Sequence, residues 1–121
     1  MSNTLFKIDA IVVAGQAIAI EDGTATLTGA ARFQNTVVPS ASGDDFQTRA
    51  RVPTTLHCKI QFASTVNPSD YSGLSDVQIT ARDTHSKRRA LMPKCSFGEM
   101  GEIGGGSVDV TFNVLAPIQW L

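Results

Sequence analysis

Residues 107–114, Ser-Val-Asp-Val-Thr-Phe-Asn-Val, alternate polar and apolar side chains without interruption. An alternation of period two places one face of a β-strand against a core and the other face in water. This run closes a C-terminal third, residues 76–116, whose pattern predicts three strands separated by two turn-rich connections. The chain is therefore expected to be a β-protein whose surfaces, rather than a catalytic motif, carry its function.

The length of 121 residues predicts a single domain spanning residues 1–121. The formal net charge of -1 argues against a domain that grips duplex DNA through its phosphates. It also leaves little electrostatic repulsion to oppose self-association. No apolar run is long enough for a transmembrane helix, and residues 1–4 show no signal-peptide pattern. Cys58 and Cys95 occupy apolar-phase strand positions, so we expect reduced, buried thiols.

Further strands are expected at residues 5–13, 16–20, 24–33, 55–63, 77–81 and 88–97. The first is apolar on both faces, which predicts that both faces are covered. Thr24, Thr26 and Thr28 share one face of the third strand, as a solvated ladder would. Pro93 interrupts the return strand at 88–97, which fits an edge or a bulge.

One short helix is expected at residues 67–74. Asn67 suits its N-cap, Pro68 its first turn, and Gly73 its end. Tyr71 and Leu74 lie three residues apart and are expected to pin the helix to the sheet. The helix is therefore a small element flanking the sheet.

Residues 34–53 show no regular pattern and are expected to form a long irregular loop. Loops of this length inside a small domain are uncommon and are usually functional. Val37, Val38, Phe46 and Val52 favour burial, so the segment is not a simple flexible linker. It packs on its own domain or is ordered by a partner subunit, and we favour the partner.

The C-terminal residues 117–121 contain the only tryptophan, Trp120, beside Ile118 and Leu121. Chain ends fray unless they dock. This apolar cluster either tucks under its own domain or anchors on a neighbouring subunit, where tryptophan is enriched.

A search for chemistry finds no catalytic, cofactor or metal signature. His57 and Cys58 are adjacent, so on a strand they face opposite sides. The run Gly104-Gly105-Gly106 lacks the Lys and Ser/Thr of a phosphate loop. The paired carboxylates Asp44-Asp45 have no second partner, and a solvated loop is the simpler interpretation. The basic cluster at residues 87–89 is either a solvated hairpin tip or a contact with an acidic partner.

The order of these elements resembles the tail tube proteins of Mu-like bacteriophages over residues 15–115. A hairpin leads into a long loop with Phe46 and Arg49, followed by Pro53 and an alternating strand. A short helix then precedes residues 76–80, and a hairpin return and a Gly/Glu-rich connection lead into residues 108–112. Pro93 departs from the expected pattern of the family.

The resemblance implies a β-sandwich or half-barrel with one flanking helix, six copies of which form a ring-shaped barrel. Stacked rings would form a hollow conduit through which DNA passes without specific binding. The loop at residues 34–53 would reach the neighbouring ring, and Thr24, Thr26 and Thr28 would be candidates for the lumen face. The inter-subunit contacts would then be Phe46, Arg49, Arg51, Asp44, Asp45, Trp120 and Leu121.

The resemblance also implies partners and a location. The partners would be copies of this chain, with sheath, tape-measure and baseplate or tail-terminator proteins as further candidates, without a membrane. The chain would assemble in the host cytoplasm and reside in the virion tail. Three alternatives stay open: a ring protein of a related contractile injection system, a monomeric β-sandwich binding module, and an enzyme. A single Trp and a single Tyr count against a carbohydrate-binding face.

Overall fold

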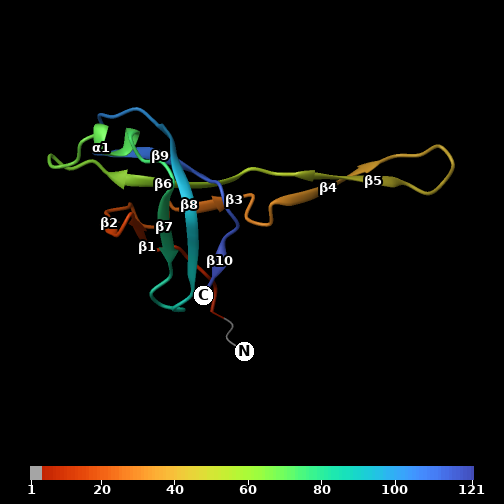
Figure 1. The fold of residues 1–121 in the computed structure, drawn as a ribbon, viewed down its shortest axis with the longest axis horizontal. Coiled ribbons are helices and arrows are strands. Elements are labelled where there is room, and N and C mark those ends of the chain that lie inside the picture. Colours follow the sequence, from red (N-terminus) through yellow and green to blue (C-terminus); the bar gives the residue numbers. More distant parts are fainter. Residues whose placement is uncertain (1–3) are drawn as a thin grey trace.

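The computed structural model describes residues 4–121, which form ten β-strands and one short helix (Figure 1). The mainly β fold with a single short helix is thus confirmed. The strands are β1 (Ala10–Val13), β2 (Gln16–Ile18), β3 (Thr26–Thr28), β4 (Phe33–Val38), β5 (Phe46–Arg51), β6 (Thr54–Gln61), β7 (Val77–Arg82), β8 (Arg89–Met100), β9 (Ser107–Val114) and β10 (Gln119–Trp120). The helix α1 spans Ser69–Ser72.

Eight strands form one antiparallel sheet in the order β2-β1-β7-β8-β9-β6-β3, with β10 paired to β8. Both edge strands, β2 and β3, belong to the stretch of residues 16–28. Between them, the backbone N–H of Glu21 donates to Lys59 of β6, and that of Gln61 donates to Ala19. The same short stretch thus bonds to β1 at its start and to β6 at its end, so the sheet curls around a single core.

Alternation along the strands builds this core, as residues 107–114 predict. In β9 every second side chain is buried, and β6 pairs with β9 over its full length with the same alternation. The largest fully buried side chains are Phe112, Ile11, Leu56, Ile60, Ile79, Met92, Val108, Val110, Cys58 and Cys95. Burying one such aliphatic or aromatic side chain contributes roughly 1.5–3 kcal/mol, so the core accounts for the stability of the domain.

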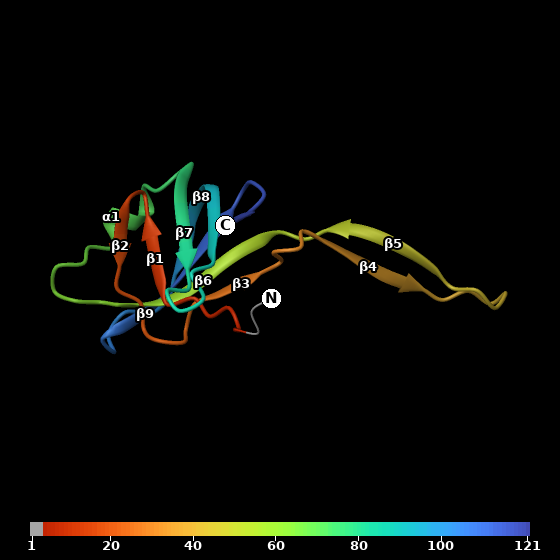
Figure 2. The ribbon, with the colours of Figure 1, turned by 90° about the horizontal axis from the view of Figure 1, so that it is seen from below.

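The segment at residues 34–53 is not the irregular loop that its sequence suggests. Strands β4 and β5 pair with each other along six residues and with no other described strand. Figures 1 and 2 show this hairpin projecting along the long axis of the molecule, at the end opposite α1. We call residues 33–51 the arm.

Several expected boundaries are corrected. The first strand begins at Ala10 rather than residue 5, and its core face is Ile11 and Val13. The strand expected at residues 24–33 shortens to β3, because the chain turns at Gly29 with a φ of +72°. The return strand β8 extends to Met100, beyond the expected end at residue 97.

Pro93 lies at a β-bulge, one of the two places expected for it. Val77 pairs with Cys95 and Ile79 with Met92, so β8 carries an extra residue there. The bulge lets an interior strand accommodate a residue that has no N–H to donate.

The helix α1 is shorter than the expected 67–74, and Asn67 is not its N-cap. Pro68 occupies that position, without a side-chain cap hydrogen bond, and Gly73 occupies the C-cap. Tyr71 and Leu74 are half-buried and pack against the core, as their spacing predicts.

Candidate assembly surfaces

The base of the arm is a tightly bonded turn. Gly29 is required there, because a Cβ atom would lie 2.3 Å from the carbonyl oxygen of Pro53, and its φ of +72° also disfavours a side chain. The hydroxyl of Thr54 donates to the Gly29 carbonyl at 2.8 Å. The N–H of Val52 donates to the Arg32 carbonyl at 2.6 Å. These bonds fix where the arm leaves the sheet.

The register of the arm separates its side chains into two chemically different faces. Asn35 pairs with Arg49 and Phe33 with Arg51, so these four side chains share one face, which we call the cationic face. The Arg49 guanidinium lies 4.1 Å from the centre of the Phe33 ring, a cation–π contact. The other, uncharged face carries Gln34, Thr36, Val38, Phe46, Thr48 and Ala50.

No core lies beneath either face of the arm. Every residue of β4 and β5 is exposed, and Phe46 retains 67% of its surface. A two-stranded hairpin alone is at best marginally stable in water. Large apolar side chains gathered on an exposed, unsupported hairpin indicate a surface that another molecule covers.

The tip of the arm is acidic. Asp44 and Asp45 lie in the connection between β4 and β5, and a carboxylate oxygen of Asp45 accepts from the Ser40 N–H at 3.2 Å. Asp45 therefore shapes the turn, whereas Asp44 is an exposed charge. The inter-subunit roles predicted for Phe46, Arg49, Arg51, Asp44 and Asp45 stay predictions, and the structure places all five on the arm.

The C-terminal segment docks on its own domain. Strand β10 pairs with β8, and the Trp120 ring meets the Phe6 ring edge-on at a centroid distance of 5.6 Å. The Arg88 guanidinium lies 4.7 Å from the centre of the Trp120 ring, a contact that no pattern in the sequence predicts. Trp120 still exposes 41% of its surface and Leu121 more. The predicted contact of Trp120 and Leu121 with a neighbouring subunit stays a prediction, and it would involve their exposed surface.

The three threonines proposed for a lumen face do not form one ladder. Thr26 and Thr28 are exposed on β3, but Thr24 precedes the strand. Its hydroxyl donates to the Glu21 carbonyl at 2.6 Å and accepts from the Lys59 N–H at 3.3 Å, which closes a turn. Only Thr26 and Thr28 therefore lie exposed on one face of a strand, as the predicted lumen face requires.

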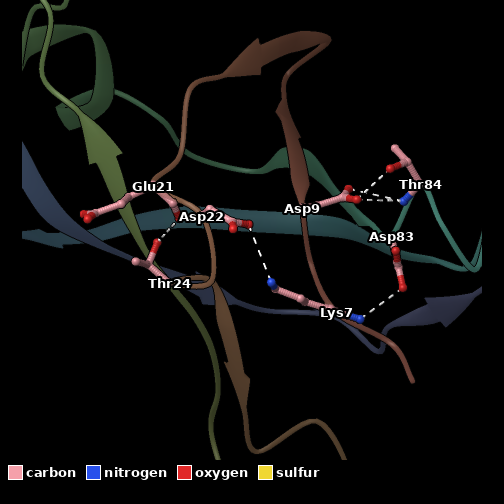
Figure 3. A network of polar contacts seen from close by, with 7 residues as sticks. All are labelled: Lys7, Asp9, Glu21, Asp22, Thr24, Asp83 and Thr84. Carbon is pink, nitrogen blue, oxygen red and sulfur yellow. Dashed lines mark hydrogen bonds and ion pairs between the residues drawn. The ribbon is translucent and has the colours of Figure 1, made fainter. Parts of the chain in front are cut away.

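Polar contacts hold residues 7–9 against the turn between β7 and β8 (Figure 3). Asp9 accepts from the hydroxyl of Thr84 at 2.6 Å, and Asp83 accepts from the Lys7 N–H at 3.1 Å. Asp83 is buried, and the Lys7 N–H, with further donors from Ser86 and His85, holds the pKa of its carboxyl below the ordinary value despite burial. The sequence showed no sign of this network, because its partners lie about 75 residues apart.

The groups with catalytic potential are dispersed or buried. Burial raises the pKa of the Cys58 thiol to about 12 and that of Cys95 to about 11, so both stay protonated and unreactive. His57 faces away from the core, with its Nε2 3.6 Å from a carboxylate oxygen of Asp109. Within residues 4–121, no three His, Cys, Asp or Glu side chains gather as metal ligands. None of the described helices is long and apolar enough to span a membrane.

Comparison with known proteins reveals similarity at the level of fold. No protein-family model and no curated protein sequence matches this chain. One similar structure is a chain of the sheath–tube complex of an extracellular contractile injection system (PVC) in the extended state. It has a TM-score of 0.63 at 8% identity, covering 98% of this chain and 90% of that one.

A second similar structure is a chain of the sheath/tube terminator of the same system, in the extended state. Its TM-score is 0.63 at 8% identity, covering 100% of this chain and 96% of that one. The chain has a fold found in the tube assembly of a contractile injection system. At such low identity the likeness concerns the fold alone, and it does not reach the Mu-like phage family in particular.

Proposed function

We propose that this chain is a structural tube subunit of a contractile injection apparatus. The observation that carries the proposal is the fold likeness, over nearly its whole length, to chains of a sheath–tube complex and of its terminator. No catalytic role is part of this proposal. In this proposal, the function depends on the surfaces through which copies of the chain would contact one another.

The arm supports a self-assembling role. It presents 12 exposed strand residues, six from each strand, without a core of its own. A contact between the arm and a different surface of the next copy would be heterologous, and such contacts generate rings or helical stacks. The near-neutral net charge of -1 leaves such stacking almost unopposed.

We further propose that copies form rings around a lumen, six to a ring, and that the rings stack inside a sheath. The first interpretation of the sequence, a phage tail tube that conducts DNA, belongs to the same architecture. The fold likeness supports the injection-system alternative better, because the two similar chains described above come from such a system. Residence in an assembled particle, after assembly in the cytoplasm, is part of this proposal.

A terminator role is the second candidate, because the TM-score to the terminator chain is also 0.63 and the coverage of both chains is higher. A terminator would form a ring that caps a tube instead of extending it. The two roles therefore differ in whether rings of this chain stack on one another.

Negative-stain electron microscopy with light scattering, across a concentration series, tests both roles. Hollow tubes would establish a tube subunit, and single rings at every concentration would favour a terminator. Particles that stay monomeric throughout would contradict the proposal and favour the binding-module alternative. The chain offers a matched variant, because the Val52 N–H already bonds to the Arg32 carbonyl at the base of the arm. Replacing residues 33–51 with an Asn-Gly turn should keep the fold and abolish assembly.

A further inference from the structure

We propose that the tip of the arm of one copy inserts into a hollow at the base of the arm of a second copy. This inference rests on the proposed function and adds the two surfaces that meet. The inserting part is the pair Val38 and Phe46, which we call the tip knob. The receiving part is the base hollow, whose lining includes the apolar residues Val52, Pro53, Val114 and Leu115 together with Arg51.

The tip knob is an apolar pair held in a fixed arrangement. Val38 and Phe46 are directly paired across β4 and β5, so their side chains stand together on the uncharged face. Both are exposed, and Asp44 lies two residues before Phe46. The arm thus carries an apolar pair on one face, next to the connection at residues 39–45 that closes the tip, in which Asp44 is the free acidic charge.

The base hollow complements the tip knob, because it has an apolar lining and a cation that forms no ion pair with the described residues. It has a volume of about 400 Å³ and lies where β6 begins and β9 ends. Leu115 exposes 47% of its surface there, beside the half-buried Val52. Among residues 4–121, Arg51 makes no ion pair, so its guanidinium is available to an acidic partner.

The knob cannot fill the hollow of its own chain. Phe46 and Val52 are six residues apart along an extended strand, which separates them by about 20 Å. Figure 2 shows the tip and the base at opposite ends of a straight arm. The two surfaces can therefore meet only between copies, and each copy would present one free knob and one free hollow.

A second apolar hollow competes for the knob, and charge decides between them. It is lined by Phe6, Ala25, Leu27 and Trp120, with Lys7 as its cation. Lys7 Nζ already lies 3.7 Å from a carboxylate oxygen of Asp22 (Figure 3). The Arg88 guanidinium near this hollow is likewise engaged, because it stacks on the Trp120 ring. Arg51 has neither an ion pair nor a ring contact among the described residues, so Asp44 would gain its free partner at the base hollow.

Photo-crosslinking tests the contact while keeping an aromatic ring at the knob. A photoreactive phenylalanine analogue replaces Phe46 in the full chain, which is mixed with isotopically labelled wild-type chain and irradiated at an assembling concentration. We expect mass spectrometry to find crosslinks between copies, from position 46 to residues 51–54 or 113–115. The matched control places the same analogue at Phe33, an aromatic residue on the cationic face beneath Arg49. Because Phe33 pairs with Arg51 of its own chain, it can label residue 51 within one copy, but it should give no crosslink between copies at the base hollow.

Each outcome bears on a different claim. Assemblies whose crosslinks between copies map to the second hollow would overturn this inference and leave the proposed function standing. The same holds if position 33 labels the base hollow of another copy as strongly as position 46 does. Crosslinks at the base hollow without rings or tubes would support the contact and count against the tube. Absence of both assembly and crosslinks would overturn both.

A charge exchange supplies an independent readout. Asp44→Lys or Arg51→Glu alone should raise the concentration needed for assembly by about tenfold, because like charges then face each other. Combining both substitutions in one chain should restore assembly to near the wild-type concentration. Failure of the combined variant to recover, while both single variants assemble poorly, would contradict the pairing of Asp44 with Arg51.

Discussion

The sheet and the arm are built from strands of similar length, yet they differ in what stabilises them. In β6 and β9 every second residue is buried, whereas β4 and β5 bury none. Strand β6 follows directly from β5 through Val52 and Pro53, so one stretch of chain passes from an unsupported hairpin into the core. The sheet thus carries the stability of the domain, whereas the proposed assembly would depend on the arm. Substitutions should therefore affect stability or assembly separately.

The largest effect should come from emptying the core. Phe112 is fully buried, so Phe112→Ala should lower the free energy of unfolding by about 3–5 kcal/mol. Urea unfolding followed by circular dichroism measures it. A decrease in the free energy of unfolding below about 1 kcal/mol, the ordinary cost of a point substitution, would show that Phe112 of β9 is not a main part of the core.

The turn between the two regions should be the next most sensitive position. Gly29→Ala should cost about 1–3 kcal/mol of stability, because the new Cβ meets the Pro53 carbonyl and the backbone adopts a positive φ. Gly105→Ala, in open space without a positive φ, is the matched control for the same urea titration. Equal effects of the two substitutions would contradict the tight base of the arm.

Acid should weaken the sheet through Asp83. A carboxylate whose pKa is lowered on folding stabilises the protein above its unfolded pKa and loses that contribution as the pH falls through the folded value. Asp83→Asn should therefore destabilise the protein at pH 7, and its difference from wild type should shrink as the pH drops below about 4. Asp44→Asn, at the exposed tip, should leave stability unchanged. A constant difference at all pH values would count against the Asp83 carboxylate as its source.

A substitution on the arm should have the smallest effect on stability and a large effect on assembly. Phe46→Ala should change the free energy of unfolding by less than about 0.5 kcal/mol, as is usual at a surface position. In light scattering, the same variant should need a far higher concentration to assemble. Loss of folding in circular dichroism would instead place Phe46 in the core, against its 67% exposure.

This contrast also explains what could be predicted from the sequence. Residues 107–114 revealed their strand because one buried face imposes a strict alternation. The arm reads as an irregular loop in the sequence because neither of its faces is buried, so Phe33, Val38, Phe46 and Arg51 follow no core-facing period. Phe and Arg side chains in a long connection still favour Phe46, Arg49 and Arg51 as contact residues by their type, and that assignment stays a prediction.

Contacts between distant parts of the chain could not be predicted from the sequence. The Trp120 cluster depends on Phe6 and Arg88, and the Asp83 carboxyl on Lys7. Each pairing follows from strand order in the sheet, which a single sequence does not reveal. The pinning role of Tyr71 was predictable because it depends on spacing within one short element.

Hydrogen–deuterium exchange, measured on the monomer and on the assembled protein, tests the separation of the two regions most directly. We predict that amides of β6 and β9 are protected in both samples, whereas amides of the arm exchange rapidly in the monomer and become protected on assembly. An arm that is protected as strongly as β9 in the monomer, or that stays unprotected in the assembly, would contradict the claim that another copy of the chain covers it.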